Sequence, residues 1–450
     1  MPATQRLLTL VVGATMLSAT PLRAQAARSL SLADAIAAAE RGNPDYQITR
    51  SDETVAVAAL RESWGAYLPS MSASVGFGGS SSRRLTTFDE FGNAVRLDDA
   101  LTSRTSSALQ SVGAELLLFD GFRREQMRNA ARSDVRAVDA RIAARRVRLR
   151  AEVARQYYRA LGAERRVRLE EGVLASAREQ LATTERRFLV ASARREDVLG
   201  AQEAILSAQA QVAQARGDAA KDRLLLAELL GGESDAPLEL TDSLPVLGDT
   251  LAASADELVA LALRASPVLQ ERDAALQTAD RRLSASRGAW WPSVRASARY
   301  GRSLSDRLNG ALFDFNPPDQ AFSLSLDVTL PVLDQFRRPA DVARAAEQRD
   351  DQAQSLRAAR LRMEQEVRAA LIDTRNAEQR VRLAEQASAL SRERVELAEQ
   401  RYRAGGLALP ELQQILDRAA ASERTEVAAR VDFATARATL QERVGGELPR

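Results

Sequence analysis

The side chains available for chemistry in this chain are carboxylates, guanidinium groups and hydroxyls. The 450 residues include no Cys and no His. Thiolate nucleophiles, disulfides, imidazole bases and the commonest zinc ligands are therefore excluded. Pairs of Asp and Glu can hydrolyse glycosides without any other group, so an exported hydrolase of that kind stays open. The sequence favours a protein that is not an enzyme and needs no cofactor.

Arginine pairs are the other groups that could bind a ligand, as at Arg145–Arg146 and Arg165–Arg166. They alternate with acidic residues along predicted helices, which is typical of a solvated helix face. The chain has 63 Lys and Arg residues against 61 Asp and Glu residues. Because this balance leaves almost no net positive charge, we predict no nucleic-acid partner.

Residues 1–26 are predicted to be a signal peptide. Arg6 precedes an apolar run from Leu7 to Ala19, and a small-x-small cleavage site follows at Ala24 to Ala26. An apolar run of this length suits a signal sequence and is too short for a membrane-spanning helix. We therefore expect an exported protein whose mature chain starts near Ala27.

The remaining chain is predicted to contain two copies of one unit. Asn43–Pro44 recurs as Ser266–Pro267 at an offset of 223 residues, whereas motifs beyond the strand signals recur at an offset of 214. Such internal repeats indicate duplicated structural units. The shift of nine residues places a longer hairpin loop in the first copy. We expect the copies to span 27–240 and 241–450.

The stretches 70–236 and 340–404 contain no proline and permit very long helices, which are predicted at 120–188 and 334–402. Both are dense in Ala, Arg, Glu, Gln and Leu, which are strong helix formers. Each would extend about 100 Å at about 1.5 Å per residue. Shorter helical stretches are expected at 33–66, 196–230, 256–289 and 410–443. Two of these stacked end to end match one long helix, which predicts a cylinder wall, although coiled-coil rods would show the same periodicity.

Four segments between the helices alternate apolar and polar residues with a period of two. The clearest runs from Phe322 to Val332, and the others begin at Met71, Val112 and Val294. Segments of about 9 to 11 residues with one apolar face fit transmembrane barrel strands. Two soluble hairpins packed on a core would alternate in the same way. The polar stretches 79–105 and 302–320 are expected to be loops on the outer face.

Aromatic residues flank these strands and favour the membrane interpretation. Tyr67, Trp290 and Trp291 stand where strands begin, and Phe122 and Phe336 follow where strands end. Such residues gather at membrane interfaces. Open sheet edges are not tolerated in lipid, so four strands require other chains to close a barrel. Two chains would give eight strands and a filled interior, whereas three would give twelve strands and a pore. A conducting duct therefore favours a homotrimer.

Charged residues stand at the predicted starts of the long helices. Asp120 and Asp334 are predicted N-caps, because their side chains can accept the free N–H groups of the first turn. Arg123 and Arg124 follow the first, and Arg337 and Arg338 follow the second. These arginines either bind lipid phosphates at the inner interface or are ordinary residues of the helix surface.

Three short motifs resemble those of the TolC-like outer membrane efflux proteins. They are Leu118 to Gly121, Asp197 to Gln202 and Tyr402 to Gly405, and the resemblance extends from about residue 31 to residue 447. It implies a mainly α-helical fold with a transmembrane β-barrel contribution. The implied trimer has one 12-stranded barrel in the outer membrane, a periplasmic α-helical barrel and an equatorial belt that includes residues 231–255.

The resemblance also implies the function and the partners. The protein would be the exit duct of a tripartite efflux or type I secretion system, located in the cell outer membrane and extending into the periplasm. It would contact outer-membrane lipid, a periplasmic adaptor and an inner-membrane pump. The substrate, whether drug, metal ion or polypeptide, stays open. An exported structural coiled-coil protein is the alternative, and it leaves the four strands unexplained.

Site residues follow from the same resemblance. The turns at 188–197 and 402–411 would be periplasmic tips that open and contact the adaptor. The tip and adaptor residues are Phe188, Ala191, Tyr402, Gly405 and Leu407. Gly405 fits a turn that needs positive φ, whereas the first copy has Ala191. The basic residue expected near Tyr402 is replaced by Leu407.

The pore constriction implied by the resemblance comprises Glu411, Gln414 and Asp197. A ring of Glu411 carboxylates in a trimer would favour cations over anions. A local explanation is also sufficient, because Pro410 is favoured at a helix start and an acid in the first turn complements the helix dipole. Both interpretations stay open.

Overall fold

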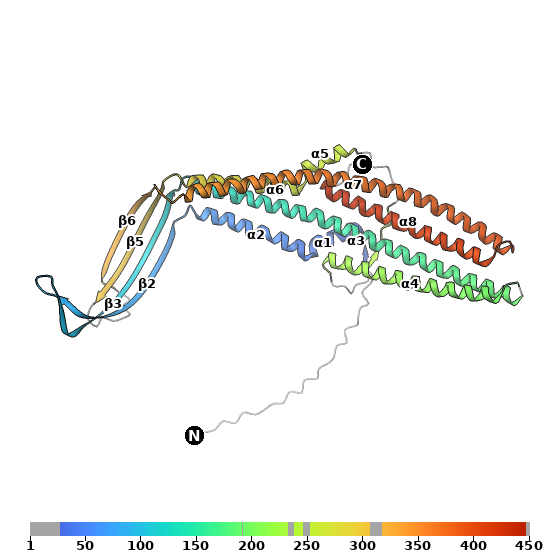
Figure 1. The fold of residues 1–450 in the computed structure, drawn as a ribbon, viewed down its shortest axis with the longest axis horizontal. Helices are drawn as coiled ribbons and strands as arrows, with labels where there is room; N and C mark the ends of the chain where they lie inside the picture. Colours follow the sequence, from blue (N-terminus) through green and yellow to red (C-terminus); the bar gives the residue numbers. More distant parts are fainter. Residues whose placement is uncertain (1–27, 191, 233–237, 246–252, 307–316, 447–450) are drawn as a thin grey trace, which may run out of the picture.

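The computed structural model describes residues 28–190, 192–232, 238–245, 253–306 and 317–446. Long helices form most of an elongated molecule, and a small sheet continues it at one end (Figure 1). The predicted signal peptide lies outside the described residues. No helix among the described residues has the length and apolar character needed to cross a membrane.

Two helices of 67 residues dominate the fold, as the sequence predicts. They are α3 (Arg123–Leu189) and α7 (Arg337–Arg403). Each forms an antiparallel hairpin with a helix of 36 residues, α4 (Arg195–Leu230) or α8 (Leu409–Val444). Four shorter helices are α1 (Leu32–Gly42), α2 (Pro44–Gly65), α5 (Ala255–Ala265) and α6 (Pro267–Gly288).

The prediction of single helices at 33–66 and 256–289 was wrong. The first stretch breaks at Asn43 and the second at Ser266, and both residues have extended backbone with ψ of 119°. A proline follows each break, and proline disfavours helical backbone in the residue before it. Pro44 and Pro267 then occupy the first positions of α2 and α6, where a missing N–H has no cost.

The shorter helices stack end to end, as expected. A Cβ added to Gly231 at the end of α4 would lie 2.0 Å from the carbonyl oxygen of Gly42, just before α2. Gly445 at the end of α8 abuts Ser266 and Pro267 at the start of α6. One stack is α4 with α2, and the other is α8 with α6. Because α3 contacts both stacks and α7 contacts the stack of α8 with α6, the order across the layer is α4/α2, α3, α8/α6 and α7. This layer is called the wall below.

One antiparallel sheet contains β2 (Ser70–Phe88), β3 (Ala94–Phe119), β5 (Ser293–Asp306) and β6 (Asp319–Thr329), in the order β2-β3-β5-β6. The prediction that 79–105 is a loop was wrong, because pairing continues to Phe88 and Ala94 around a turn closed by Asp89 and Asn93. Backbone N–H and C=O groups pair here although the two strands have no continuous apolar face. β5 and β6 likewise extend into the expected loop 302–320, whose residues 307–316 lie outside the described chain.

A second layer covers one face of the wall. It consists of α1, α5 and a parallel pair of short strands, β1 (Arg28–Leu30) and β4 (Leu238–Leu240), and is called the belt. The buried Tyr157 hydroxyl of α3 donates to the Leu30 carbonyl over 2.9 Å. Burial raises the Tyr157 pKa to about 12. Leu149, Val153 and Tyr157 form one core with α1, and their counterparts in α7 pack against α5.

Both long helices begin with the same arrangement of Asp, Arg and an aromatic ring. The Asp120 carboxylate accepts the Arg124 backbone N–H over 2.9 Å, and Asp334 accepts that of Arg338 over 2.9 Å. The N-cap positions themselves are Phe122 and Phe336. The prediction that Asp120 and Asp334 are the N-caps was therefore wrong, although each aspartate accepts a first-turn N–H as expected, from two residues before the cap.

Of the four arginines at these helix starts, Arg123 and Arg337 are exposed, whereas Arg124 and Arg338 are not ordinary surface residues. Arg124 lies over the Tyr67 ring at 4.9 Å, and Arg338 lies over the Trp290 ring at 4.6 Å. Their side chains are 14% and 12% exposed and form ion pairs with the neighbouring Asp120 and Asp334. Each arginine therefore joins the start of a long helix to the residues that lead into the sheet.

Candidate functional site at the helical tips

The helices turn back on themselves at the end of the molecule farthest from the sheet (Figure 1). The first tip, residues 188–197, joins α3 to α4, and the second tip, residues 402–411, joins α7 to α8. Ala191 lies outside the described residues. Both turns occur where the sequence predicts them.

The second tip is built around a left-handed glycine. Gly405 has φ of +78°, a conformation that costs residues with a Cβ atom. The Gly405 N–H donates to the Tyr402 carbonyl over 3.0 Å, and the Gly406 N–H donates to the Arg401 carbonyl over 2.9 Å. These bonds satisfy carbonyl groups that the end of α7 would otherwise leave free.

An arginine of the first hairpin holds the end of the second. The Arg187 guanidinium lies 4.2 Å from the centroid of the Tyr402 ring. It also donates to the Tyr402 carbonyl over 2.7 Å and to the Arg403 carbonyl over 3.3 Å. A positive group at a helix C-terminus complements the negative end of the helix dipole. Arg187 therefore joins the two hairpins at the tips.

Sequence reasoning missed Arg187. The sequence predicted a basic partner for Tyr402 at position 407, five residues further along the chain, where Leu407 stands. The basic partner in the structure lies 215 residues earlier, in α3. The only local signal was an arginine in the last turn of a predicted helix, which usually binds carbonyl groups of its own helix.

Leu407 contributes apolar contact in place of a charge. It is half-buried and packs against a cluster of Ala398, Tyr402, Leu409 and Leu412. Tyr402 is only 5% exposed. The second tip is thus a compact turn with its own small core.

The first tip is more open. Phe188, Leu189 and Val190 are all exposed, with Leu189 83% exposed. The Asp197 carboxylate accepts the Arg194 backbone N–H over 2.8 Å, so this acid caps the start of α4. An apolar, solvent-exposed end of this kind is suited to contact with another protein.

Glu411 is the counterpart of Asp197, 214 residues later and at the same helical position. Glu411 is exposed, and among the described residues it has no hydrogen bond or ion pair. Gln414, one turn further along α8, is also exposed. No bond joins Asp197, Glu411 and Gln414 within one described chain, so a single chain does not assemble them into a constriction.

A buried ion pair joins the hairpins above the tips. Glu170 of α3 is 1% exposed and accepts two hydrogen bonds from Arg424 of α8, over 2.6 and 2.7 Å. The bonds to Glu170 raise the pKa of the Arg424 guanidinium. The bidentate geometry fixes the two helices relative to each other. Beside this pair, a groove of about 860 Å³ runs between all four helices of the two hairpins.

The chain thus combines one four-stranded sheet built from two repeats, paired long helices and a one-sided belt. The outer membrane efflux protein family model matches residues 26–232 and 258–446. The chain therefore belongs to the outer membrane efflux protein family.

Individual relatives agree with that assignment. Outer membrane efflux protein BepC of Brucella suis biovar 1 (strain 1330) is 27% identical over 355 residues, which cover 75% of this chain and 68% of BepC. A membrane protein from Pseudomonas aeruginosa has a similar fold, with a TM-score of 0.76, 21% identity and coverage of 92% and 90%. The Neisseria gonorrhoeae MtrE outer membrane channel, crystallised in its open state, gives a TM-score of 0.73 at 22% identity, with coverage of 93% and 90%.

The family fixes the broad function. The protein is an efflux channel component of the outer membrane, with a helical part that extends into the periplasm, and it is not an enzyme. The absence of His and Cys from the sequence is compatible with this role.

Proposed function

We propose that three copies of this chain form the exit duct of a tripartite efflux or type I secretion system. In this proposal the two repeats, 27–240 and 241–450, supply four strands per chain to a 12-stranded barrel. The two long helices and the two stacks of shorter helices form the chain's share of a periplasmic tube. A periplasmic adaptor and an inner-membrane pump deliver the substrate. The observation that carries the proposal is an apolar stripe on each edge of the wall.

The first stripe lies on α7, at one edge. It consists of Leu361, Ile372, Leu383, Leu390 and Leu397, all more than half exposed. At about 100° per residue, spacings of 7 and 11 place these side chains within roughly 40° of one another around the helix. Such a continuous apolar stripe in a single chain indicates a missing partner.

The second stripe lies on the opposite edge, along the stack of α4 and α2. Its members are Leu199, Leu206 and Leu224 on α4 and Ile48 and Val55 on α2, and they are also exposed. Two different apolar edges that meet head to tail generate a ring when the rotation between neighbouring copies closes. Contact between α7 of one copy and α4/α2 of the next would bury both stripes.

The sheet requires the same closure. β2 and β6 are its outer strands, and each has one unpaired edge. Phe322, Leu324, Leu326 and Val328 project from one face of β6 and are all more than 60% exposed. Lipid would cover such a face, and strands of neighbouring copies would pair the edges.

The aromatic residues near the sheet fit a membrane interface. Trp290, Trp291, Phe122 and Phe336 are all more than half exposed. Tyr67 is half-buried, and its hydroxyl donates to Glu125 over 3.1 Å. We assign the four exposed rings to the inner interface of the outer membrane and Tyr67 to a supporting role beside them.

The tips form the periplasmic entrance in this proposal. Phe188 and its exposed neighbours supply adaptor contacts together with Ala191 and Leu407, and Tyr402 and Gly405 maintain the second turn. Three copies of Glu411, with Gln414 and Asp197 nearby, line the constriction. Free carboxylates in a narrow pore attract cations.

The test combines purification with a variant of the α7 stripe. We expect wild-type protein to require detergent, to elute as a trimer by light scattering and to show a mainly helical circular dichroism spectrum with a β contribution. Leu390→Glu places a charge in the stripe and should yield monomers. The matched variant Ala389→Glu lies about 100° away around α7 and should stay trimeric.

A monodisperse, water-soluble monomer would contradict the proposal. A detergent-free rod with intact helices would instead support the exported structural coiled coil. Conductance of the trimer in planar bilayers completes the test, because a structural protein carries no ions.

A further inference from the structure

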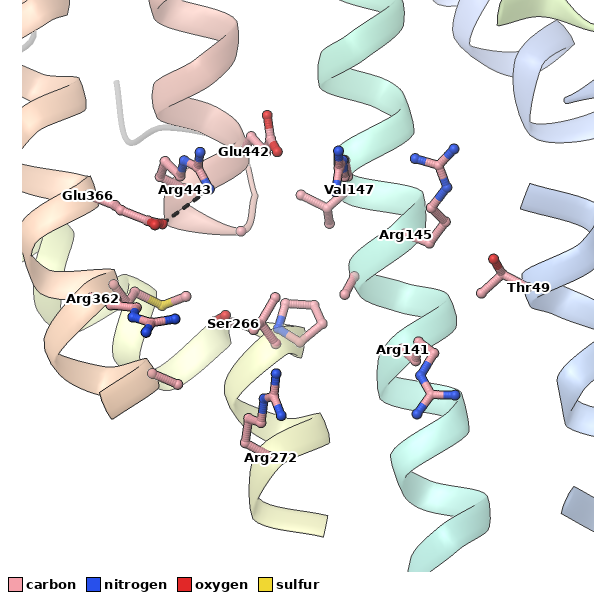
Figure 2. Close-up of a pocket in the computed structure, with 17 residues that line it drawn as sticks. Thr49, Arg141, Arg145, Val147, Ser266, Arg272, Arg362, Glu366, Glu442 and Arg443 are labelled. Atoms are coloured by element: carbon pink, nitrogen blue, oxygen red, sulfur yellow. Dashed lines mark ion pairs between the residues drawn. The ribbon is translucent and has the colours of Figure 1, made fainter. Parts of the chain in front are cut away.

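A cavity of about 470 Å³ lies beside the junction of α8 with α6, far from the tips. Its lining includes six arginines and two glutamates from α3, α6, α7 and α8, and Figure 2 draws the lining residues as sticks. The arginines are Arg141, Arg145, Arg148, Arg272, Arg362 and Arg443. The glutamates are Glu366 and Glu442. Guanidinium groups thus outnumber carboxylates by four in the cavity wall.

Four of the six arginines have carboxylate partners. Arg141 pairs with Glu271, Arg145 and Arg148 share Glu152, and Arg443 pairs with Glu366 over 3.1 Å. Most of these pairs are solvent-exposed or half-buried, so each is weak and leaves donors free.

Arg272 and Arg362 differ from these four. Neither has an ion pair or side-chain hydrogen bond with any described residue. Figure 2 shows Arg362 extending from α7 toward the start of α6, and Arg272 rising along α6 toward the same end. Side chains on a helix tilt toward its N-terminus, which places Arg272 beside the first turn of α6. Two guanidinium groups without carboxylate partners, both on exposed residues, therefore line the cavity from different helices.

The start of α6 adds uncharged donors at that point. Ser266 lines the cavity and is 3% exposed, yet its hydroxyl has no hydrogen-bond partner among the described residues. The Ser266 side chain does not cap α6. In the first copy the equivalent Asn43 caps α2, because its side chain accepts the Tyr46 N–H over 3.0 Å. The second copy thus leaves a hydroxyl on the cavity wall and first-turn N–H groups available to an acceptor.

We propose that this cavity binds a small, multiply charged anion, of the diphosphate or polycarboxylate class. Arg272 and Arg362 supply charge-assisted, potentially bidentate hydrogen bonds. Ser266 and the helix N-terminus supply neutral donors. A single carboxylate or chloride would leave part of this donor set unused.

The position of the cavity excludes a lipid headgroup. Arg141 to Arg148 lie 18 to 25 residues along α3 from Arg123, where the helix starts next to the sheet. That separation is about 27 to 38 Å. The anion must therefore be a solute.

The cavity also opens on the wall face that the belt does not cover. Arg146 and Arg150 of α3 bind Glu40 of the belt. Arg148 lies about 200° around α3 from Arg146, so it faces the other side. A conducting tube must carry its belt outside, and the cavity then faces the bore. This orientation rests on the proposed function, whereas anion binding itself does not.

Isothermal titration of the detergent-solubilised protein with inorganic pyrophosphate, at low ionic strength and neutral pH, tests the site. We expect about one bound anion per chain. The double variant Arg272→Gln/Arg362→Gln should weaken binding at least about tenfold, because it removes two charged donors. Ser266→Ala should weaken it by less.

The matched control is Arg281→Gln/Arg357→Gln. These two arginines lie on the same helices, are exposed and line no cavity described above. Unchanged binding in this control, with elution and circular dichroism unchanged in every variant, supports a specific site. Equal weakening in both double variants, or no binding by wild type at millimolar pyrophosphate, overturns the proposal.

Conductance separates this proposal from the proposed function. If pyrophosphate lowers the current through wild-type channels but not through Arg272→Gln/Arg362→Gln channels, the site faces the bore. Binding without any channel activity would retain the anion site and refute the duct. Channel activity without pyrophosphate binding would retain the duct and refute the anion site.

Discussion

The two helical tips are copies of one turn, yet they are stabilised in different ways. The second tip uses a left-handed glycine, Gly405, and a small core around Tyr402. The first tip has no positive φ among its described residues, and its acid Asp197 caps α4. The first tip exposes Leu189, whereas Tyr402 in the second is almost fully buried.

This difference indicates a division of roles between the copies. Arg187 of the first hairpin grips the end of α7, so the second tip depends on the first for part of its stability. The exposed apolar end of the first tip is available to a partner, and the free Glu411 of the second is available to ions. Under the proposed function, we expect the first tip to contact the adaptor and the second to line the entrance.

The largest effect is expected from Gly405→Val. A β-branched residue at positive φ costs more than the roughly 1 to 2 kcal/mol typical of other residues, so the second turn should rearrange. Export in a resistance or secretion assay should fall strongly while trimer formation and membrane insertion persist. Gly406→Val is the matched control, because Gly406 has no positive φ and a Cβ there meets only Arg401 at 3.6 Å. Normal export by Gly405→Val would contradict the role of Gly405 in the second turn.

Arg187→Gln should release the second tip from the first. It removes a cation–π contact and a charged hydrogen bond, together worth about 1 to 3 kcal/mol. The population of open entrances should rise roughly tenfold, which planar-bilayer recordings would show as increased conductance. Arg186→Gln is the control, since Arg186 binds only groups of its own helix. Equal conductance in both variants would contradict the link between tips.

Glu411→Ala and Asp197→Ala test the two equivalent acids. Glu411 has no described partner, so its removal should weaken cation selectivity and block by trivalent cations without loss of stability. Asp197 caps α4, and its removal should cost about 1 kcal/mol of stability with a smaller change in selectivity. Reversal potentials and thermal unfolding measure the two effects. Identical results for both variants would contradict the assignment of Asp197 to helix capping and of Glu411 to ion selectivity.

The smallest effect is expected from Leu407→Ala. Leu407 is half-buried beside Tyr402, and truncation should cost about 1 kcal/mol. Trypsin should then cleave faster after Arg403, because the turn opens more often. Leu189→Ala at the first tip removes a side chain that is 83% exposed and should leave cleavage unchanged.

Much of the fold could be predicted from local sequence. The repeat and the proline-free stretches predicted the two long helices and both turns within a few residues, and the alternating segments predicted the presence of the four strands. The errors were local too: Pro44 and Pro267 split two helices, and backbone pairing extended β2 and β3 through a polar stretch. Polar strands with two solvated faces carry no alternation, so sequence patterns did not reveal them.

In the candidate site, too, local features could be predicted from the sequence and long-range contacts could not. The sequence alone determined the left-handed turn at Gly405 and the first-turn acids Asp197 and Glu411, because these depend on φ preference and helix-end chemistry within a few residues. Only the tertiary structure decided that Arg187 binds Tyr402 and that Glu170 binds Arg424, which lie 215 and 254 residues apart. No periodicity encodes such pairs, since they depend on which helix faces pack together.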